Sequence, residues 1–400
     1  METIPFARPW TGKEEEEAVL RVLRSGWLTT GREALAFEAE FSAFLMERAA
    51  PGEPEIQALA VNSATSGLHL ALEALGIGPG DAVFLPSYTF TATAEVVRYL
   101  GAEAVFVDLE GDSYNIGPAG LEQALSRALG PGIRPRAVIP VHFGGLPCDM
   151  GAIKDLARRY GLAVVEDAAH AFPAPLPGKD SPWAGTGGDA GVFSFYATKT
   201  ITTGEGGMVV TRRKDLAERV SLMRSHGIDR SIWNRYTDPK APWYYEVVAP
   251  GYKYNLPDLL AALGRVQLSR AMELLKMRES IAARYDGALK NHGAVILPPP
   301  GGARHLYTLR FRNPADRDPC MEYLRNKGIG TSVHFIPLHI MPYYKERYGL
   351  KAEEYPESLK RFRETLSLPI WPGMSEAQVD RVIGAVREAP AACGTGGFSA

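Results

Sequence analysis

Short apolar runs alternate with amphipathic, helix-like segments through the first half of the chain. The runs are four or five residues long and recur between residues 58 and 211, and the segments between them carry apolar residues at helical spacing. Buried strands that alternate with helices are typical of a doubly wound, mostly parallel sheet. We therefore predict an α/β fold with strands at 58–61, 82–85, 104–107, 137–141, 162–165, 191–195 and 208–211.

The same periodicity predicts the helices and a second domain. A large domain over residues 1–255 would hold the seven-stranded sheet, because the chain is too long for one minimal core. A smaller α+β domain would follow over 256–390, and the residues from 391 to 400 have little to bury and predict a mobile tail. The predicted helices are 11–24, 33–47, 66–75, 91–100, 119–129, 150–160, 212–224, 259–290, 316–327 and 376–388, with two further strands at 306–311 and 331–335.

Polar residues follow several strands at the edge where doubly wound sheets bind ligands. Thr65 and Ser66 open the helix after the first strand, and the unpaired N–H groups of such a helix can bind phosphate. An ordinary helix cap is the alternative. We expect Gly67 to let a phosphate approach this turn. Because side chains alternate along a strand, only one of Glu166 and Asp167 can face the ligand, and we choose Asp167.

Lys199 is the strongest candidate for chemistry. It lies in the stretch SFYATKTITTGEGG, between an apolar strand and a glycine-rich turn, with Phe195 and Ile201 close by in the sequence. Apolar walls remove water from a lysine amine, which lowers its pKa and makes it a nucleophile toward carbonyl carbon. A solvated loop lysine is the alternative.

Composition excludes several classes of function. The formal net charge is −2, which gives no electrostatic basis for binding nucleic acid or an anionic membrane. The three cysteines are widely spaced and form no CxxC pair. His334 and His339 have no further cluster of metal-binding residues beside them in the sequence, so we predict no metal site. No stretch approaches the length of a membrane helix and no secretion signal is visible, so we expect a cytoplasmic protein.

Several further motifs accompany the lysine stretch. They are VNSATSGLHLALEAL, PSYTFTAT, PVHFGGLPCDM, VVEDAAHA, GYKYNLPDLLAALG and VHFIPLH, in that order along the chain. Together they resemble the DegT/DnrJ/EryC1/StrS family of nucleotide-sugar aminotransferases, which use pyridoxal 5′-phosphate (PLP), and they extend over about residues 10–375. The resemblance implies the fold type I aminotransferase fold and a homodimer with shared active sites.

The resemblance also implies a role for each candidate residue. Lys199 would hold PLP as a Schiff base and then transfer protons as a general acid and base. Asp167 would lie against the pyridine nitrogen and keep it protonated, and Phe90 would stack on the ring. His170 would lie beside the ring, either contacting its 3-oxygen side or orienting Asp167. The implied phosphate contacts are Thr65, Ser66 and Ser194.

The segment 228–250 and the GYKYNLPD stretch after it would, by resemblance, contribute to the active site of a neighbouring subunit. The family often carries Asn at the position of Lys253 and Arg at that of Asn255, and this chain departs from both. Either Lys253 or Asn255 could therefore supply a phosphate contact across the dimer.

The activity implied is transamination of a nucleotide-linked keto-sugar in amino sugar biosynthesis. L-Glutamate would be the amino donor, and the lysine motif is most similar to that of enzymes acting at C4 of UDP-linked 4-keto sugars. Two alternatives stay open: a PLP-binding regulatory or inactive paralogue, and a PLP-dependent sugar dehydratase of the same family. Members of the dehydratase branch replace the lysine by histidine, so Lys199 favours the aminotransferase.

Overall fold

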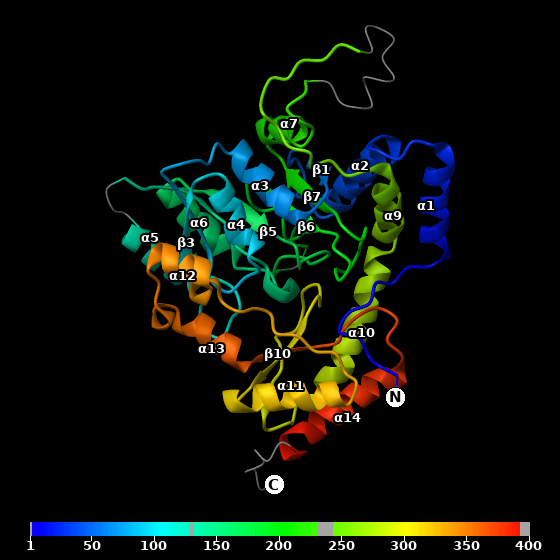
Figure 1. The fold of residues 1–400 in the computed structure, drawn as a ribbon, viewed down its shortest axis with the longest axis vertical. Coiled ribbons are helices and arrows are strands. Elements are labelled where there is room, and N and C mark those ends of the chain that lie inside the picture. Colours follow the sequence, from blue (N-terminus) through cyan, green and yellow to red (C-terminus); the bar gives the residue numbers. More distant parts are fainter. Residues whose placement is uncertain (1, 129–131, 179, 230–242, 393–400) are drawn as a thin grey trace.

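The sheet predicted from the apolar runs is the centre of the molecule. The computed structural model describes residues 2–128, 132–178, 180–229 and 243–392 (Figure 1). Seven strands form one sheet in the order β1-β7-β6-β5-β4-β2-β3, and only β7 runs antiparallel to its neighbours. The strands are β1 (Gln57–Val61), β2 (Asp81–Pro86), β3 (Glu103–Val107), β4 (Arg134–Val138), β5 (Ala163–Asp167), β6 (Ala190–Ser194) and β7 (Gly207–Thr211).

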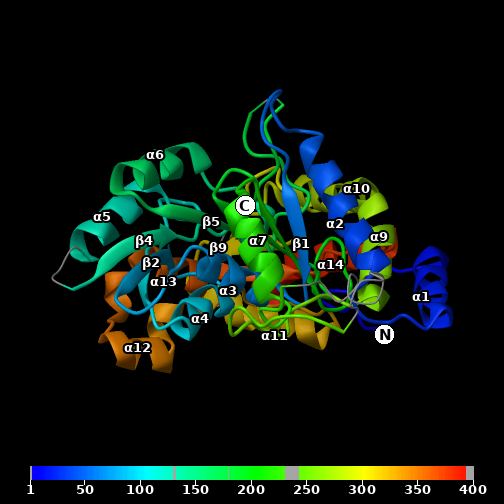
Figure 2. The same ribbon diagram turned by 90° about the horizontal axis from the view of Figure 1, so that it is seen from above.

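Helices cover both faces of this sheet, because successive side chains of each strand point to opposite faces. Residues such as Val61, Val192 and Val209 form one core with α3, α4 and α7. Their neighbours on the other face, including Phe193, pack against α2, while β2, β4 and β5 pack against α5 and α6. Seen from above, α5 and α6 lie at one end of the molecule and α1 at the other (Figure 2). The helices are α1 (Lys13–Ser25), α2 (Arg32–Met46), α3 (Ala64–Ala74), α4 (Ala92–Tyr99), α5 (Pro118–Ala128), α6 (Met150–Tyr160) and α7 (Lys214–Met223).

The long helix predicted at 259–290 is two helices. Helix α9 (Asp258–Ser269) ends where Arg270 leaves the helical conformation, with φ −104° and ψ 5°, and α10 (Ala271–Leu289) begins directly after it. Helix α9 packs against α1 and α2, and α10 continues into the C-terminal part (Figure 1). The apolar spacing continues across Arg270, which is why the break leaves no signal in the sequence.

The C-terminal part has its own antiparallel sheet and its own apolar core. The sheet order is β10-β9-β8, and its core includes Tyr307, Leu366 and Trp371. The strand predicted at 331–335 is wrong: only Ser332 pairs with the sheet, through Ser367, and the segment then lines a cavity. The elements are β8 (Val295–Ile296), β9 (Tyr307–Phe311), β10 (Thr365–Leu368), α11 (Arg317–Asn326), α12 (Pro342–Tyr348), α13 (Pro356–Glu364) and α14 (Glu376–Ala392).

The predicted division at residue 255/256 stays a prediction. Helix α14 extends to Ala392, two residues into the predicted tail, and residues 393–400 lie outside the described part. The described part contains no helix that is both long and apolar enough to cross a membrane.

Candidate active site

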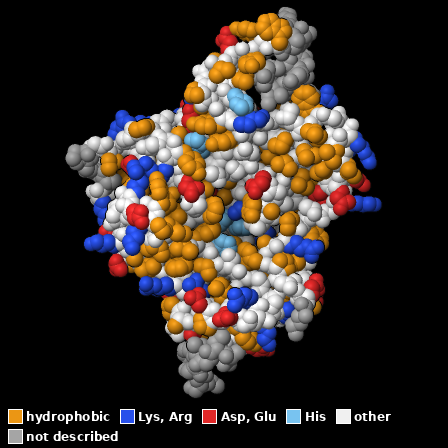
Figure 3. Space-filling view, in the orientation of Figure 1, with side chains coloured by type: hydrophobic (Ala, Val, Ile, Leu, Met, Phe, Trp, Pro, Cys, Tyr) orange, Lys and Arg blue, Asp and Glu red, His pale blue; other side chains and the backbone are white. Residues whose placement is uncertain are grey.

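A cavity of about 550 Å³ lies where β5 and β6 end and the C-terminal part covers the sheet. It brings together six of the nine predicted site residues, which come from four separate segments of the chain. In Figure 3 a hollow near the centre of the face exposes histidine side chains. The six predicted residues that line the cavity are Thr65, Phe90, Asp167, His170, Ser194 and Lys199.

Lys199 lies in the turn after β6, and its backbone N–H donates to the Tyr196 carbonyl at 2.9 Å. Its Nζ is 3.5 Å from Nε2 of His305. Burial lowers the pKa of Lys199 to about 7, with Asp167 opposing the shift and Arg278 adding to it. Roughly half of the amine is therefore neutral at pH 7, compared with less than about 0.1% of an ordinary lysine. A neutral amine is the form that attacks a carbonyl or accepts a proton.

Asp167 ends β5 with its carboxylate in the cavity. Thr93 Oγ1 donates to Oδ2 at 2.9 Å, and the Ala169 N–H donates to Oδ1 at 3.1 Å. Burial raises the pKa of Asp167, and the two hydrogen bonds and the Lys199 amine oppose this shift. Glu166 points away into the interior, where it contacts His142 at 2.8 Å. The choice between the two carboxylates therefore follows from the pleat of β5.

The start of helix α3 offers backbone donors at the other end of the cavity. Ser63 is the N-cap, and Ala64 and Thr65 contribute N–H groups that have no acceptor within the helix. Ser66 does not face the cavity: its hydroxyl donates to the Ser63 carbonyl at 2.7 Å and completes a capping box. The position of Gly67 also differs from the expectation. A Cβ there would lie 2.7 Å from Val192, so Gly67 lets α3 pack closely on the sheet.

Phe90 and His170 form aromatic parts of the cavity wall. The Phe90 side chain is 57% exposed, and its ring lies 5.8 Å from that of Phe335. The Gly144 N–H donates to Nδ1 of His170 at 3.2 Å, so in the neutral ring the hydrogen is on Nε2. Burial and the nearby Lys199 hold the pKa of His170 well below its ordinary value. Within the described residues no hydrogen bond joins His170 to Asp167, so the structure gives no support to an orienting role.

Lys253 and Asn255 lie apart from this cavity. Lys253 donates to Asn255 Oδ1 at 2.7 Å, and Asn255 Nδ2 donates to Thr30 at 2.6 Å. Neither residue lines the Lys199 cavity of its own chain. Residues 230–242, which belong to the segment predicted to reach a neighbouring subunit, lie outside the described residues.

The sequence analysis did not predict several cavity residues as parts of the site, although it considered His334 as a metal ligand. His305, His334 and Phe335 come from the C-terminal part and face Lys199 across the cavity. Thr93 holds Asp167 from helix α4. Sequence spacing gives no signal for these contacts, since His305 lies 106 residues from Lys199. Three residues of the strand predicted at 331–335 are in fact part of the cavity wall: Ser332, His334 and Phe335.

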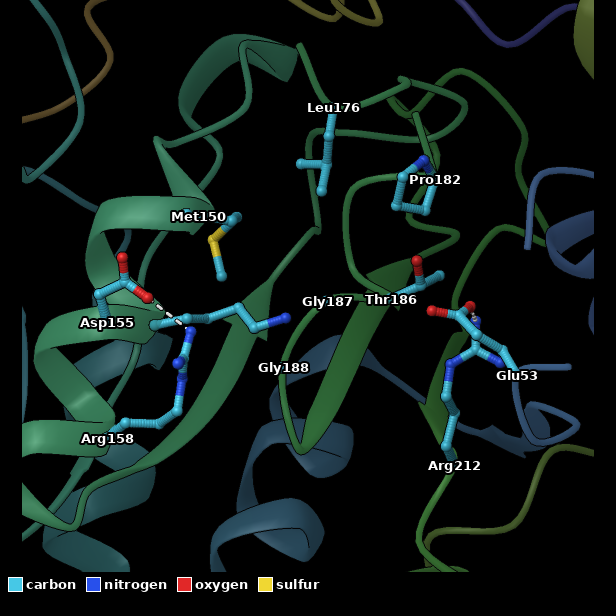
Figure 4. A pocket seen from close by; sticks show the side chains of 12 residues that line it. Glu53, Met150, Asp155, Arg158, Leu176, Pro182, Thr186, Gly187, Gly188 and Arg212 are labelled. Carbon is cyan, nitrogen blue, oxygen red and sulfur yellow. Dashed lines mark hydrogen bonds and ion pairs between the residues drawn. The ribbon is translucent and has the colours of Figure 1, made fainter. Parts of the chain in front are cut away.

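A second cavity, of about 340 Å³, contains none of the predicted residues. It lies between α6 and the loop at 182–188, and Figure 4 shows two pairs of charged side chains at its edges. Arg158 pairs with Asp155 at 2.5 Å, and Arg212 pairs with Glu53 at 2.6 Å. In the part of the chain that the structure describes, no three His, Cys, Asp or Glu side chains are grouped as metal ligands would be.

The residues of the Lys199 cavity fit PLP. A phosphate suits the N-terminus of α3, which combines free N–H groups with the positive end of the helix dipole. A protonated pyridine nitrogen suits Asp167, which is a buried carboxylate with no cation paired to it within the described residues. An aldehyde suits the amine of Lys199, and the exposed ring of Phe90 suits an aromatic face.

Comparison with known proteins agrees with this fit. The family model described as "DegT/DnrJ/EryC1/StrS aminotransferase family" matches residues 9–387. The spore coat polysaccharide biosynthesis protein SpsC of Bacillus subtilis is 43% identical over 393 residues, which cover 96% of each chain. The aminotransferase TlmJ of Streptoalloteichus hindustanus has a TM-score of 0.85 and 34% identity, covering 98% of this chain and 100% of its own. The PLP form of the putative sugar aminotransferase Spr1654 of Streptococcus pneumoniae has a TM-score of 0.86 and 29% identity, with the same coverage.

These matches extend over nearly the whole chain, and the residues that line the cavity fit the cofactor. We therefore conclude that the chain is an enzyme and reject the alternative of a regulatory or inactive paralogue. The chain is a member of the DegT/DnrJ/EryC1/StrS family of sugar aminotransferases, enzymes that use pyridoxal 5′-phosphate as cofactor.

Proposed function

We propose that the protein transfers the amino group of L-glutamate to a UDP-linked 4-keto sugar and forms the nucleotide-linked 4-amino sugar. One observation supports this most strongly: a lysine whose pKa is about 7 shares one cavity with a buried carboxylate and an open helix N-terminus. The cavity volume of about 550 Å³ is in the range of small-molecule sites and suits a cofactor with one sugar ring. The relatives named as sugar aminotransferases support the sugar class.

Bound PLP would supply an electron sink for the carbanion that forms when the donor carbon loses its proton. The N-terminus of α3 and the hydroxyls of Thr65 and Ser194 would bind its phosphate. Thr93 and the Ala169 N–H keep Asp167 in place, where its carboxylate would hold the proton on the pyridine nitrogen. Phe90 would cover one face of the ring and exclude water from it.

Lys199 would carry the protons. In the first half-reaction its neutral amine would accept the proton from the α-carbon of the donor and pass it to the cofactor, which regenerates the neutral amine. In the second it would take a proton back from the cofactor and give it to the sugar carbon that receives the amino group. A pKa near 7 allows both steps without a large energy difference between the two forms. His170, with its hydrogen on Nε2, would donate a hydrogen bond to the 3-oxygen side of the ring.

The proposal includes a cytoplasmic homodimer with shared active sites. Lys253 is exposed and lies outside the cavity of its own chain, so a partner's cavity is where it or Asn255 would contact a phosphate. The described part of the segment that projects at the top of Figure 1 carries exposed apolar side chains, and Trp243 is 76% exposed. Exposed aromatic residues of this kind favour burial against another chain.

The test is a transamination assay with matched lysine variants. We would incubate the protein with PLP and L-glutamate, and then with a panel of UDP-linked and dTDP-linked 4-keto and 3-keto sugars, measuring amino sugar by mass spectrometry. The UDP-linked 4-keto sugar should be converted most efficiently, and Lys199→Ala should form no product. Lys154→Ala removes an ordinary lysine from the second cavity and should keep wild-type activity. Preference for another nucleotide or ring carbon, or no turnover with L-glutamate, would contradict the finer assignment.

A further inference from the structure

The ε-amine of Lys199 has one hydrogen-bonding side chain beside it within the described residues. That side chain is His305, whose Nε2 lies 3.5 Å from Nζ. Asp167 acts on Lys199 only through longer-range electrostatic attraction, since no ion pair or hydrogen bond joins the two in the described part. When the amine is not joined to the cofactor, the imidazole is therefore the polar group that can hold it.

A buried arginine fixes both members of this pair. Arg278 of helix α10 is 2% exposed, and its guanidinium donates to the carbonyl of His305 at 3.3 Å and to the carbonyl of Thr198 at 3.4 Å. A third bond, of 2.7 Å, goes to the Ile370 carbonyl. One guanidinium thus joins the backbone next to Lys199 to the backbone of His305. Within the described residues this buried cation is held only by carbonyls, which is costly and indicates a role beyond packing.

The imidazole of His305 can pair with either form of the lysine amine. Nδ1 is buried and has no hydrogen-bond partner among the described residues, so the hydrogen can be on either ring nitrogen without breaking another bond. Burial, together with the charges of Lys199 and Arg278, keeps the pKa of His305 well below its ordinary value, so the ring is neutral. A neutral ring accepts from the ammonium through bare Nε2, or donates to the neutral amine through Nε2–H.

The orientation of the ring is also restricted. The His305 ring lies 4.4 Å from the His170 ring, and its side chain is 7% exposed. The carbonyl held by Arg278 and the packing against His170 both restrict the movement of His305. These contacts favour one direction of Nε2 through a reaction in which the lysine amine moves and changes charge.

We propose that His305 is a positioning residue, which hydrogen bonds the free ε-amine of Lys199 through Nε2 and keeps it aimed at the reacting carbon during proton transfer. The inference rests on the proposed role of Lys199. In this role the C-terminal part of the chain contributes to proton transfer by Lys199. The motif around Lys199 does not reveal that contribution.

Three substitutions separate the possible roles of the ring. In His305→Gln the terminal amide places a polar atom near the position of Nε2, while in His305→Asn the amide places one near Nδ1. His305→Phe keeps a planar ring against His170 and removes both nitrogens. His69→Phe is the control, because His69 is also buried and has an unpartnered Nε2 but lies away from the cavity. Thermal unfolding identifies any variant that fails to fold.

The first readout is exchange of the α-hydrogen of L-glutamate with solvent deuterium in the PLP-loaded enzyme. This exchange reports proton transfer by Lys199 and does not require a sugar substrate. We expect a loss of about 10- to 100-fold in His305→Phe and His305→Asn, and a rate within about threefold of wild type in His305→Gln and His69→Phe. Equal exchange rates in His305→Gln and His305→Phe would overturn the proposal. So would a wild-type rate in His305→Asn but not in His305→Gln.

The second readout uses the protein without cofactor. Competitive labelling with acetic anhydride over a range of pH, followed by mass spectrometry, measures the pKa of Lys199 directly. Loss of an acceptor for the ammonium should lower this pKa in His305→Phe and leave it near 7 in His305→Gln. An unchanged pKa in a folded His305→Phe variant would contradict the hydrogen bond. If wild type exchanges no α-hydrogen, the proposed function fails, and this second readout still decides whether His305 holds Lys199.

Discussion

The hydrogen bond from Thr93 to Asp167 is predicted to set the affinity for PLP. Thr93 Oγ1 donates to Asp167 Oδ2 at 2.9 Å, and the two side chains are 1% and 6% exposed. Thr93→Val removes the hydroxyl and leaves a side chain of nearly the same size. A hydrogen bond to a charged group contributes about 1.5–3 kcal/mol. Its loss should therefore raise the pKa of Asp167 further, because the hydrogen bond stabilises the ionised form.

The loss should appear as weaker cofactor binding, because an ionised Asp167 is the form that holds a protonated pyridine nitrogen. About 1.5–3 kcal/mol corresponds to a decrease in PLP affinity of about 10- to 100-fold. Burial already raises the pKa of Asp167, so the variant's defect should grow as pH falls and more of the carboxyl is protonated. Titration of the protein without cofactor, followed by absorbance at several pH values, measures both effects.

Thr89→Val is the matched control. Thr89 Oγ1 lies 3.0 Å from Thr93 Oγ1, and Thr89 makes no hydrogen bond to Asp167 in the described part of the chain. We expect its PLP affinity to stay within about threefold of wild type. Wild-type affinity in Thr93→Val at every pH, or an equal loss in Thr89→Val, would refute the reasoning.

Three further variants test the surroundings of the site. Glu166→Gln should destabilise the fold by about 3–5 kcal/mol in denaturant unfolding, because it breaks the buried contact with His142. Since His142 and backbone N–H groups hold the pKa of Glu166 below its ordinary value despite burial, wild-type stability should fall as pH drops below about 4.5, and this dependence should be weaker in the variant. Gly67→Ala should cost about 1–3 kcal/mol, since the new methyl group meets Val192 at 2.7 Å; unchanged stability would show that α3 can shift. Phe90→Leu should weaken PLP binding about fivefold, which equilibrium titration measures, and no change would remove Phe90 from the ring site.

The strands could be predicted from the sequence because each is a buried apolar run, but their ends could not. Strand β4 begins at Arg134, three residues before the predicted start, because Arg134 pairs with Asp81 of β2. Arg134 and Arg136 are charged and exposed, so hydrophobicity gives no signal for the start of this strand. The pairing partner decides where such a strand starts, and that partner lies some 50 residues away in the sequence.

The site residues that lie on the sheet could be predicted from the sequence. Those that the C-terminal part contributes over the sheet could not. Asp167, Ser194 and Lys199 lie at or just after strand ends, where topology predicts ligands. Ser66 and Gly67 belong to the same helix start, but local packing directs one into a capping box and the other toward the sheet. Residues such as His305 reach the cavity only because two parts of the chain pack together, and no local pattern records such a contact.

The central claim is that Lys199 is the residue that binds the cofactor. Reduction of the PLP-loaded protein with borohydride converts a carbon–nitrogen double bond to lysine into a stable single bond, and peptide mass spectrometry then locates the modified residue. We predict the modification on the peptide containing Lys199, because its amine combines a pKa of about 7 with a place in the cavity beside Asp167. A modification on another lysine, or none in protein that has bound PLP, would contradict the account.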